Sequence, residues 1–595
     1  MGFLRKMAQQ VGAFWASEGT EANQQVALKD FWGELLQVEM EAGTTAVHQV
    51  MRQNMGLIVP ALGDVIAQSM PRLLAQYPNQ AEGVAGLVED TCISISDFPY
   101  GRYTEVQGIA IRGYGVVLEL GIYTAERRAR TLNNLGNACL SQAQMGINPT
   151  ANLERAITTY NEAARIMRQL GLDKNLSGTL NNLGNARLSQ AQMGINPTAN
   201  LESAITTYNE AARIMRQLGL DKNLSGTLTG LGSARLSQAQ MGINPTANLE
   251  SAITTYNEAA RISRQLGLDK DLSGILTNLG LAHLSQAQMG INPTANLESA
   301  ITTYNEAARI SRQLGLKLDL SDALTNLGLA RLTQAEMGIN PAANLESAIT
   351  AYNEAARIRR ELGLDKDLSQ TLNNLGSVHL SQAQMGINPT ANLESAITAY
   401  NEAARIRREL GLDKDLSDTL TNLGSARTTQ AEMGINPTAN LESAIAAYDE
   451  AAGISRQLGL DKDLSQTLTN LGVTRTTQAS MGINPAANLE SAIAAYNEAA
   501  RIRRELGLDK DLSDTLNNLG VTRTTQAEMG INPTANLESA IAAYDQAARI
   551  SRQLGLDKDF SQTLNNFGSA HSTQASMGIN PAANLESAIA AYDQA

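Results

Sequence analysis

The chain has 595 residues and a formal net charge of -13 at pH 7, with 43% hydrophobic and 18% charged residues. This composition is typical of a globular protein, and the negative charge argues against nucleic acid or an anionic membrane as the main partner. Aromatic residues make up only 4%, so the core must consist mostly of Ala, Leu and Ile, which favours close-packed helices. Two Cys and four His leave little material for a metal site or a disulfide framework.

The N-terminal stretch contains no continuous apolar run, because Gln9 and Gln10 interrupt it, and it does not predict a secretory signal. The most apolar stretch, residues 55–70, contains Pro60 and Asp64 and is too short to span a bilayer. We therefore expect a cytoplasmic protein without a membrane partner.

From Thr131 onward the sequence repeats every 48 residues, which predicts stacked copies of one supersecondary unit. Ten units are present, and ten of the 14 prolines occupy one position in them. The marker Leu-x-Asn-Leu-Gly begins at Leu132, Leu180, Leu276, Leu324, Leu372, Leu420, Leu468 and Leu516. The third and tenth units carry variants of it, at Leu228 and Leu564.

The second unit shows a first helix in its apolar pattern. Apolar and small residues recur at helical spacing between Leu180 and Ala191. Ser177 is predicted to cap the start of this helix. Gly194 is predicted to end it, since a left-handed residue after a helix costs glycine nothing.

A second helix follows in the same unit. Residues 195–200 are predicted to form a loop, because the residue before Pro197 disfavours the helical conformation. Asn200 is predicted to cap the second helix, whose apolar stripe starts at Leu201 and which ends at Gly219. Each unit is therefore a helical hairpin that needs its neighbours to bury its apolar stripe.

Two segments of the second unit, LNNLGNA and SAITTYNEAA, resemble the tetratricopeptide repeat. The resemblance implies an all-α fold, a right-handed α-solenoid of stacked helical hairpins whose first helices line a concave groove. The family repeat has about 34 residues. We expect about eight of the additional residues in the loop between the helices and the rest after the second helix.

The resemblance continues upstream, where Ala110, Ile111 and Tyr114 match the pattern of the repeats. We predict a degenerate half repeat at residues 105–130, a helical N-terminal capping region at residues 1–104, and ten repeats at residues 131–595, the last one truncated. The stretch ISISDFPYGRYTEVQGIAIRGYGVVLEL also resembles the sensor part of cyanobacterial tetratricopeptide proteins, which often end in a caspase-like CHAT domain. No CHAT domain is present in this sequence.

Residues for catalysis are scarce. Cys92 and His48 could form a nucleophile pair, and the alternative is a buried thiol with an incidental His. Cys139 stands where other units have Arg or His and indicates tolerated drift. His283, His379 and His571 replace the same Arg and lie too far apart for one metal site. We expect no enzyme, no metal and no cofactor.

An Asn recurs in the first helix of nine units, and only the third unit breaks the row, with Gly230. This Asn row is Asn134, Asn182, Asn278, Asn326, Asn374, Asn422, Asn470, Asn518 and Asn566. The resemblance implies that these side chains bind the backbone of an extended peptide, since an amide offers both a donor and an acceptor. The alternative is that each Asn bridges neighbouring repeats.

Variation between units predicts the character of such a groove. We call the residues three positions after the Asn row the second row: Asn137, Asn185, Ser233, Leu281, Leu329, Ser377, Ser425, Val473, Val521 and Ser569. A third position changes from Leu140 and Leu188 to Thr428, Thr476 and Thr524. If these rows face the groove, its middle is more apolar and its later part carries hydroxyl groups.

The function predicted from these features is a protein–protein interaction scaffold that binds an extended segment of a protein or peptide partner in the concave groove. A regulatory arm is the competing class, with an effector domain of the CHAT type beyond residue 595. A passive spacer is the third class, and a helical-repeat reader of RNA is disfavoured by the acidity. Because Ala595 lies within the predicted last helix, we expect either a longer native chain or an open docking face at that end.

Overall fold

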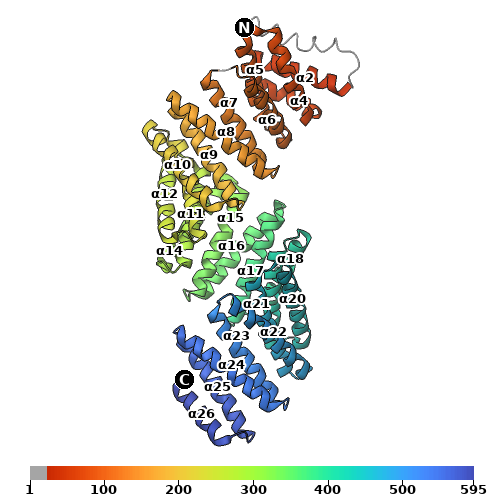
Figure 1. Ribbon diagram of the computed structural model, residues 1–595, viewed down its shortest axis with the longest axis vertical. Helices are drawn as coiled ribbons and strands as arrows, with labels where there is room; N and C mark the ends of the chain where they lie inside the picture. Colours follow the sequence, from red (N-terminus) through yellow and green to blue (C-terminus); the bar gives the residue numbers. More distant parts are fainter. Residues whose placement is uncertain (1–22, 123) are drawn as a thin grey trace. The chain divides into compact units, whose positions relative to one another are not determined.

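The computed structural model describes residues 23–122 and 124–595, and α-helices dominate this part of the chain, in which no strand occurs (Figure 1). The contacts divide the chain into two compact units, one up to Asn296 and one from Leu297 onward. The helices before the repeats are α2 (Asn23–Ala42), α3 (Thr44–Gln53), η1 (Met55–Leu57), α4 (Pro60–Gln76), η2 (Pro78–Gln80), α5 (Ala81–Ser96) and α6 (Tyr103–Glu119).

The repeats alternate between a first and a second helix. The first helices are α7 (Ala125–Gln144), α9 (Asp173–Gln192), α11 (Asp221–Gln240), α13 (Asp269–Gln288), α15 (Lys317–Glu336), α17 (Asp365–Gln384), α19 (Asp413–Glu432), α21 (Asp461–Ser480), α23 (Asp509–Glu528) and α25 (Asp557–Ser576). The second helices are α8 (Pro149–Leu170), α10 (Pro197–Leu218), α12 (Pro245–Leu266), α14 (Pro293–Leu314), α16 (Pro341–Glu361), α18 (Pro389–Glu409), α20 (Pro437–Leu458), α22 (Pro485–Glu505), α24 (Pro533–Gln553) and α26 (Pro581–Gln594). The predicted fold class of stacked tetratricopeptide-like hairpins is confirmed.

The additional residues of the long repeat lengthen its helices and not its loops. In the second repeat α9 has 20 residues and α10 has 22, and only residues 193–196 separate them. The prediction that the extra residues lie in the loop and after the second helix is therefore wrong. Longer helices give each hairpin more surface to bury against its neighbours.

The start of the second helix explains part of this difference. Asn196 adopts the left-handed conformation with φ 41°, and Pro197 is the first residue of α10. Proline at this position needs no backbone hydrogen bond and has the φ angle of a helix already. The sequence Asn-Pro thus begins the helix three residues before the predicted cap. Asn200 lies inside α10, and its Nδ2 donates to the Ile195 carbonyl at 2.7 Å.

The start of the first helix was also predicted too late. Helix α9 begins at Asp173, directly after the two-residue link that follows α8. Ser177 is buried inside α9, and its hydroxyl donates to the Lys174 carbonyl at 2.8 Å. It therefore does not cap the helix.

The predicted end of the first helix is confirmed. Gly194 has φ 77°, its N–H donates to the Ala191 carbonyl, and the N–H of Ile195 donates to the Gln190 carbonyl. This pair of bonds satisfies carbonyl groups that a helix end leaves without partners. Gly219 has φ 64° and ends α10 in the same manner.

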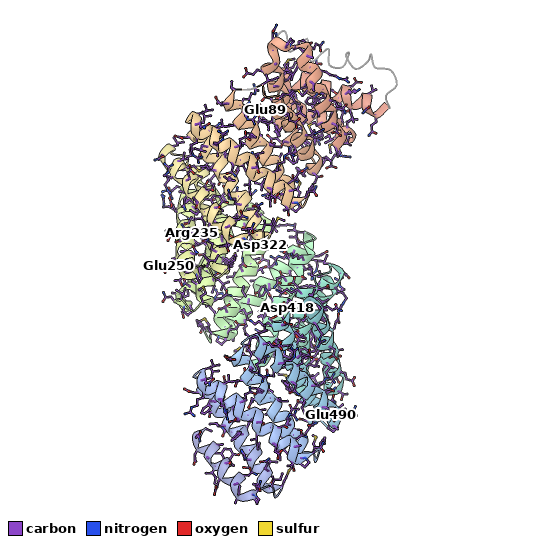
Figure 2. All side chains as sticks on the ribbon, in the orientation of Figure 1. Glu89, Arg235, Glu250, Asp322, Asp418 and Glu490 are labelled. Carbon is purple, nitrogen blue, oxygen red and sulfur yellow. The ribbon has the colours of Figure 1, made fainter. Side chains whose placement is uncertain are left out.

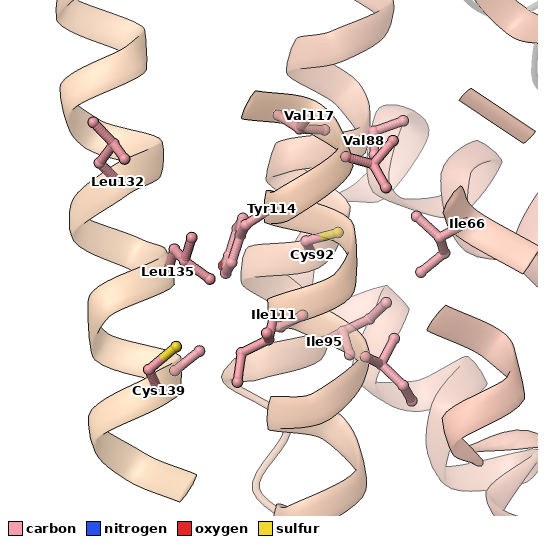
Figure 3. Packing of buried hydrophobic residues seen from close by; sticks show 14 of the residues in the cluster. Ile66, Val88, Cys92, Ile95, Ile111, Tyr114, Val117, Leu132, Leu135 and Cys139 are labelled. Atoms are coloured by element: carbon pink, nitrogen blue, oxygen red, sulfur yellow. The ribbon is translucent and has the colours of Figure 1, made fainter. Parts of the chain in front are cut away.

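A buried apolar cluster runs without interruption from Leu28 in α2 to Ile214 in α10. Figure 3 shows Tyr114 of α6 between Cys92 of α5 and Leu135 of α7, so the helices before the repeats share a core with the first repeat. A shared core is what the predicted capping role requires. The predicted domain limits at residues 104 and 130 stay predictions.

A buried carboxylate strengthens this junction. Glu89 of α5, labelled in Figure 2, is fully buried and accepts hydrogen bonds from Arg127 at 2.9 Å and Thr131 at 2.9 Å, both in α7. Arg130 of the same helix forms a second ion pair with it at 3.3 Å. A buried charge requires such partners.

Candidate functional site: the surface of the first helices

The first helices form the crowded side of each stack. Within the first unit α7 packs on α9, and α9 on α11; within the second unit the same packing links α15, α17, α19, α21, α23 and α25 in turn. In the described residues, second helices of consecutive repeats show no comparable packing. Crowding on one side and spreading on the other makes the side of the first helices concave, and we call it the groove surface.

Long side chains connect the second helices on the opposite side. In the second unit Arg408 of α18 contacts Glu450 of α20 at 2.7 Å, and Arg456 of α20 contacts Glu498 of α22 at 3.0 Å. These side chains are about half exposed, and exposed ion pairs contribute little free energy.

A Tyr from each second helix reaches through its hairpin to the groove surface. In the second repeat the Tyr208 hydroxyl donates to Asn185 Oδ1 at 2.6 Å, and in the sixth Tyr400 Oη lies 3.0 Å from Ser377 Oγ. The ring crosses the Gly of the first helix so closely that a Cβ on Gly184 would lie 2.6 Å from Tyr208. The Gly and the Tyr of the repeat pattern therefore form one packing unit, which fixes the position of the second row.

The fifth repeat lacks this bond. Leu329 stands where six of the ten repeats carry Ser or Asn, and the Tyr352 hydroxyl is buried without a hydrogen-bond partner. Burial raises the pKa of Tyr352, and Asn374 of the next repeat lies near enough to offset part of that shift. Leu281 and Leu329 of the second row thus coincide with the unpartnered hydroxyls of Tyr304 and Tyr352 in the fourth and fifth repeats.

All nine members of the Asn row lie half-buried on first helices. Three of them donate to an Asn of the preceding repeat: Asn182 to Asn137 at 2.9 Å, Asn422 to Asn373 at 3.4 Å, and Asn566 to Asn517 at 3.0 Å. Each amide has further donors and acceptors. Both the bridging and the peptide-contact hypotheses therefore stay open, and within the second unit every first helix from α15 to α25 carries one member.

Gly230, the exception in the row, packs against the preceding repeat. A Cβ at this position would lie 2.7 Å from the Tyr208 ring. The Asn row thus runs beside the Tyr of the repeat before it, at the junction of two repeats.

The Leu-to-Thr change does not simply add hydroxyl groups to the groove surface. Thr428 is buried, and its hydroxyl lies 2.9 Å from that of Thr474 in the next repeat. Thr476 and Thr522 form the same contact at 3.1 Å. The expectation that these hydroxyl groups face the groove is therefore wrong for Thr428. Its hydroxyl is buried between two first helices, where it forms a hydrogen bond.

A second Asn in each repeat has a structural role that the sequence analysis missed. Asn344 donates to the Ile339 carbonyl at 2.7 Å and accepts from Arg331 Nη1 at 2.8 Å. In the sixth repeat His379 Nδ1 replaces the Arg and lies 2.7 Å from Asn392 Oδ1. The same contact is made by Arg427, Arg523, His283 and His571, so in these repeats Arg and His both donate to the Asn, which holds the loop between the helices.

In the first repeat the loop Asn has a different side-chain partner. Cys139 occupies the position of the Arg or His, and Asn152 Nδ2 lies 3.2 Å from Gln142 Oε1. The exchange between Arg331 and His379 preserves a contact with the Asn, and the drift inferred for Cys139 stays a prediction. The spacing of 13 residues between the Arg or His and the Asn was the available signal in the sequence.

The thiol of Cys92 is a poor nucleophile. It is fully buried, burial raises its pKa, and it packs against Gly113. His48 contacts the Ser94 carbonyl at 2.8 Å. A nucleophilic Cys needs a lowered pKa and access to substrate, so this environment supports the structural alternative.

Among the described residues, no three His, Cys, Asp or Glu side chains are placed to hold a metal ion. No described helix is long and apolar enough to cross a bilayer.

The groove surface is hollowed between the eighth and ninth repeats. A hollow of about 310 Å³ lies there, with Val473, Val521 and Met481 as apolar lining and Asn518, Thr477 and Ser480 as polar lining. One member of the Asn row and two of the second row therefore meet at one concave site.

No known protein family matches the chain, and no curated protein is similar to it. Solved structures with a related arrangement of helices include a signal-transduction ATPase with a tetratricopeptide repeat sensor from Pyrococcus horikoshii, at 13% identity over 96% of this chain and 88% of that one, with a TM-score of 0.38. A Rap protein in complex with competence and sporulation factor matches at 14% identity over 67% of this chain and 99% of that one, with a TM-score of 0.33. BtubC from P. vanneervenii matches at 20% identity over 44% and 92%, with a TM-score of 0.33. At these TM-scores the likenesses carry no argument about partners or activity.

Proposed function

We propose that this protein is an interaction scaffold whose groove surface binds an extended segment of a partner protein. The observation that carries the proposal is the hollow beside Asn518, where amide, hydroxyl and aliphatic side chains converge on the crowded side of the stack. An extended backbone has a donor and an acceptor on each residue, and the Asn side chains offer the complementary groups.

Repetition suits such binding. One Asn per repeat places equivalent amides on consecutive first helices, so a segment that crosses several repeats sums many weak contacts. This arrangement would favour backbone recognition, with the second row adding preference for particular side chains.

A sensor arm of a larger signalling protein, with a CHAT-type effector beyond residue 595, would use the same groove surface. The two roles differ in the consequence of binding. In a scaffold, binding only recruits the partner, whereas in a sensor arm it transmits a change to another domain. A passive spacer would bind nothing at this surface.

The test selects random 12-residue peptides on the immobilised full chain and measures their affinity by fluorescence anisotropy. The variant Asn326→Ala/Asn374→Ala removes two members of the Asn row, and Asn353→Ala/Asn401→Ala removes two exposed Asn side chains from second helices. We expect the first variant to weaken binding by about tenfold, since each lost hydrogen bond is worth about 0.5–1.5 kcal/mol. The second should leave the affinity unchanged.

Two results would overturn the proposal. Failure to select any peptide would support the spacer. Unchanged affinity with a lowered melting temperature in Asn326→Ala/Asn374→Ala would show that the Asn row only bridges repeats.

A further inference from the structure

The groove surface of the second unit carries carboxylates in alternate repeats. Asp418 and Glu432 stand in the seventh repeat, and Asp514 and Glu528 in the ninth, whereas the eighth has Gln466 at the position of the Asp and Ser480 at that of the Glu. The fifth repeat has the same pair, but its Asp322 is bound to Arg359 at 2.8 Å. The charge pattern therefore has a period of two repeats.

These carboxylates share a helix face with the hollow. Residues 514, 518, 521, 525 and 528 of α23 fall on one side of a helix with 3.6 residues per turn, and Asn518 and Val521 line the hollow. Asp514 and Glu528 are exposed and lie about 21 Å apart along the helix, since each residue rises by about 1.5 Å. They flank the hollow on both sides.

Their surroundings favour a positive partner. Burial raises the pKa of Asp514, the carboxylates of Asp559 and Asp511 raise it further, and Lys510 and Arg503 offset only part of this shift. Burial and neighbouring carboxylates raise the pKa of Asp418 in the same way, and burial raises that of Glu432. A cation beside these groups would lower the free energy of their charged forms.

The position of the Glu residues adds a second reason. Glu432 is the last residue of α19, and Glu528 is the last residue of α23. The carboxyl end of a helix carries partial negative charge, so an acidic side chain is unfavourable there and a cation is favourable. The groove surface thus combines a hollow lined by uncharged residues with carboxylates in the seventh and ninth repeats.

We propose that the groove surface of repeats seven to nine binds an extended polypeptide segment with Lys or Arg on both sides of an aliphatic residue. The aliphatic side chain enters the hollow between Val473 and Val521, and the basic side chains pair with the carboxylates of the seventh and ninth repeats. This inference rests on the proposed function, because it names the class of segment that the same surface takes.

The repeat spacing sets the spacing of the basic residues. Packed helices lie about 9 Å apart, so two repeats span about 18 Å. An extended chain rises about 3.3 Å per residue, which separates the basic residues by about six positions. The hollow lies nearer to the ninth repeat than to the seventh, so the aliphatic residue stands asymmetrically between them.

The probes are fluorescent 13-residue Gly/Ser peptides with Lys at positions 4 and 10 and Leu at position 6 or 8, the two orders allowing for either chain direction. Matched probes carry Glu instead of Lys, or Gly instead of Leu. We expect one Lys/Leu probe to bind the full chain at least about fivefold more tightly than either matched probe, because Glu is repelled by the carboxylates and Gly leaves the hollow unfilled. The affinity should fall with added salt.

Matched variants separate the groove surface from the overall charge. Asp514→Asn/Glu528→Gln should weaken the Lys/Leu probe by about fivefold, whereas Glu394→Gln/Glu490→Gln, which removes two exposed charges from second helices, should not. Val521→Lys should abolish binding, and Asn401→Lys on a second helix, with the same added charge, should preserve it. Melting temperatures confirm that each variant is folded.

The outcomes distinguish the two proposals. Equal binding of the Lys and Glu probes, or equal effects of the two charge variants, would overturn the inference of a basic segment. The proposed function would still stand if the selected peptides lose affinity in Asn326→Ala/Asn374→Ala. If no peptide binds in a way that depends on Asn326 and Asn374, the proposed function itself is overturned.

Discussion

Tyr400 Oη lies 3.0 Å from Ser377 Oγ across the hairpin of α17 and α18, whereas Tyr352, one repeat earlier, is buried beside Leu329 without a hydrogen-bond partner. The two tyrosines are equally buried and occupy equivalent positions. They therefore form a natural comparison between a satisfied and an unsatisfied hydroxyl group.

Tyr400→Phe should cost about 1 kcal/mol, because it removes a made hydrogen bond, whereas Tyr352→Phe should be neutral or stabilise the protein by up to about 1 kcal/mol. Denaturant unfolding together with hydrogen exchange in the affected repeat measures both effects, since a repeat array need not unfold as one unit. A larger loss for Tyr352→Phe would contradict the assignment of the unpartnered hydroxyl.

Gly376→Ala should destabilise the sixth repeat by about 1–3 kcal/mol, because the new Cβ would lie 2.7 Å from the Tyr400 ring. Gly178→Ala is the matched control in another first helix. Nothing lies within 4 Å of a Cβ there, so the substitution should stabilise the helix by about 0.5–1 kcal/mol. Equal effects of the two substitutions would show that the Tyr does not require a Gly beneath it.

Arg407→Met should change stability by less than about 1 kcal/mol, although Arg407 is almost fully buried and donates to Gln370 at 2.9 Å. Met215 occupies the equivalent position in the second repeat, so an apolar side chain of similar size fits this repeat junction. Arg407→Ala should cost about 2–4 kcal/mol, since it also leaves a cavity that the Met side chain would fill. Thermal unfolding of both variants tests this contrast. If the charge of Arg407 is essential, Arg407→Met will be destabilised as much as Arg407→Ala.

His379 should make the sixth repeat less stable in mildly acidic solution. Burial lowers its pKa below the ordinary value near 6.5, so the unfolded chain binds a proton more readily than the folded one. Stability from this residue is complete above the ordinary pKa and falls as the pH drops below it. Stability measured at pH 7.5 and pH 5.5 should therefore show a smaller loss in His379→Arg, which keeps a donor to Asn392 without titrating. Carboxylates common to both proteins, such as Glu432, cancel in this difference.

Some features of the groove surface could be predicted from the sequence and others could not. The Asn row could be found because it repeats, and its members do lie on first helices, one on each from α15 to α25. The hollow between Val473 and Val521 could not be found, because it depends on how two first helices approach one another. The loop contact of Arg331 with Asn344 was likewise missed, since a spacing of 13 residues has no meaning until the chain turns back.

The sequence by itself determined the all-helical hairpin, the 48-residue period and the ends of the helices at Gly194 and Gly219, because these follow from apolar spacing and from the backbone freedom of glycine. The tertiary structure decided the roles of Asn200, Ser177 and the Thr428 row. Each of these polar side chains had several local partners within reach, and only the packing of helices showed which bond is made. Local rules thus define the repeat, and contacts between repeats define its surface.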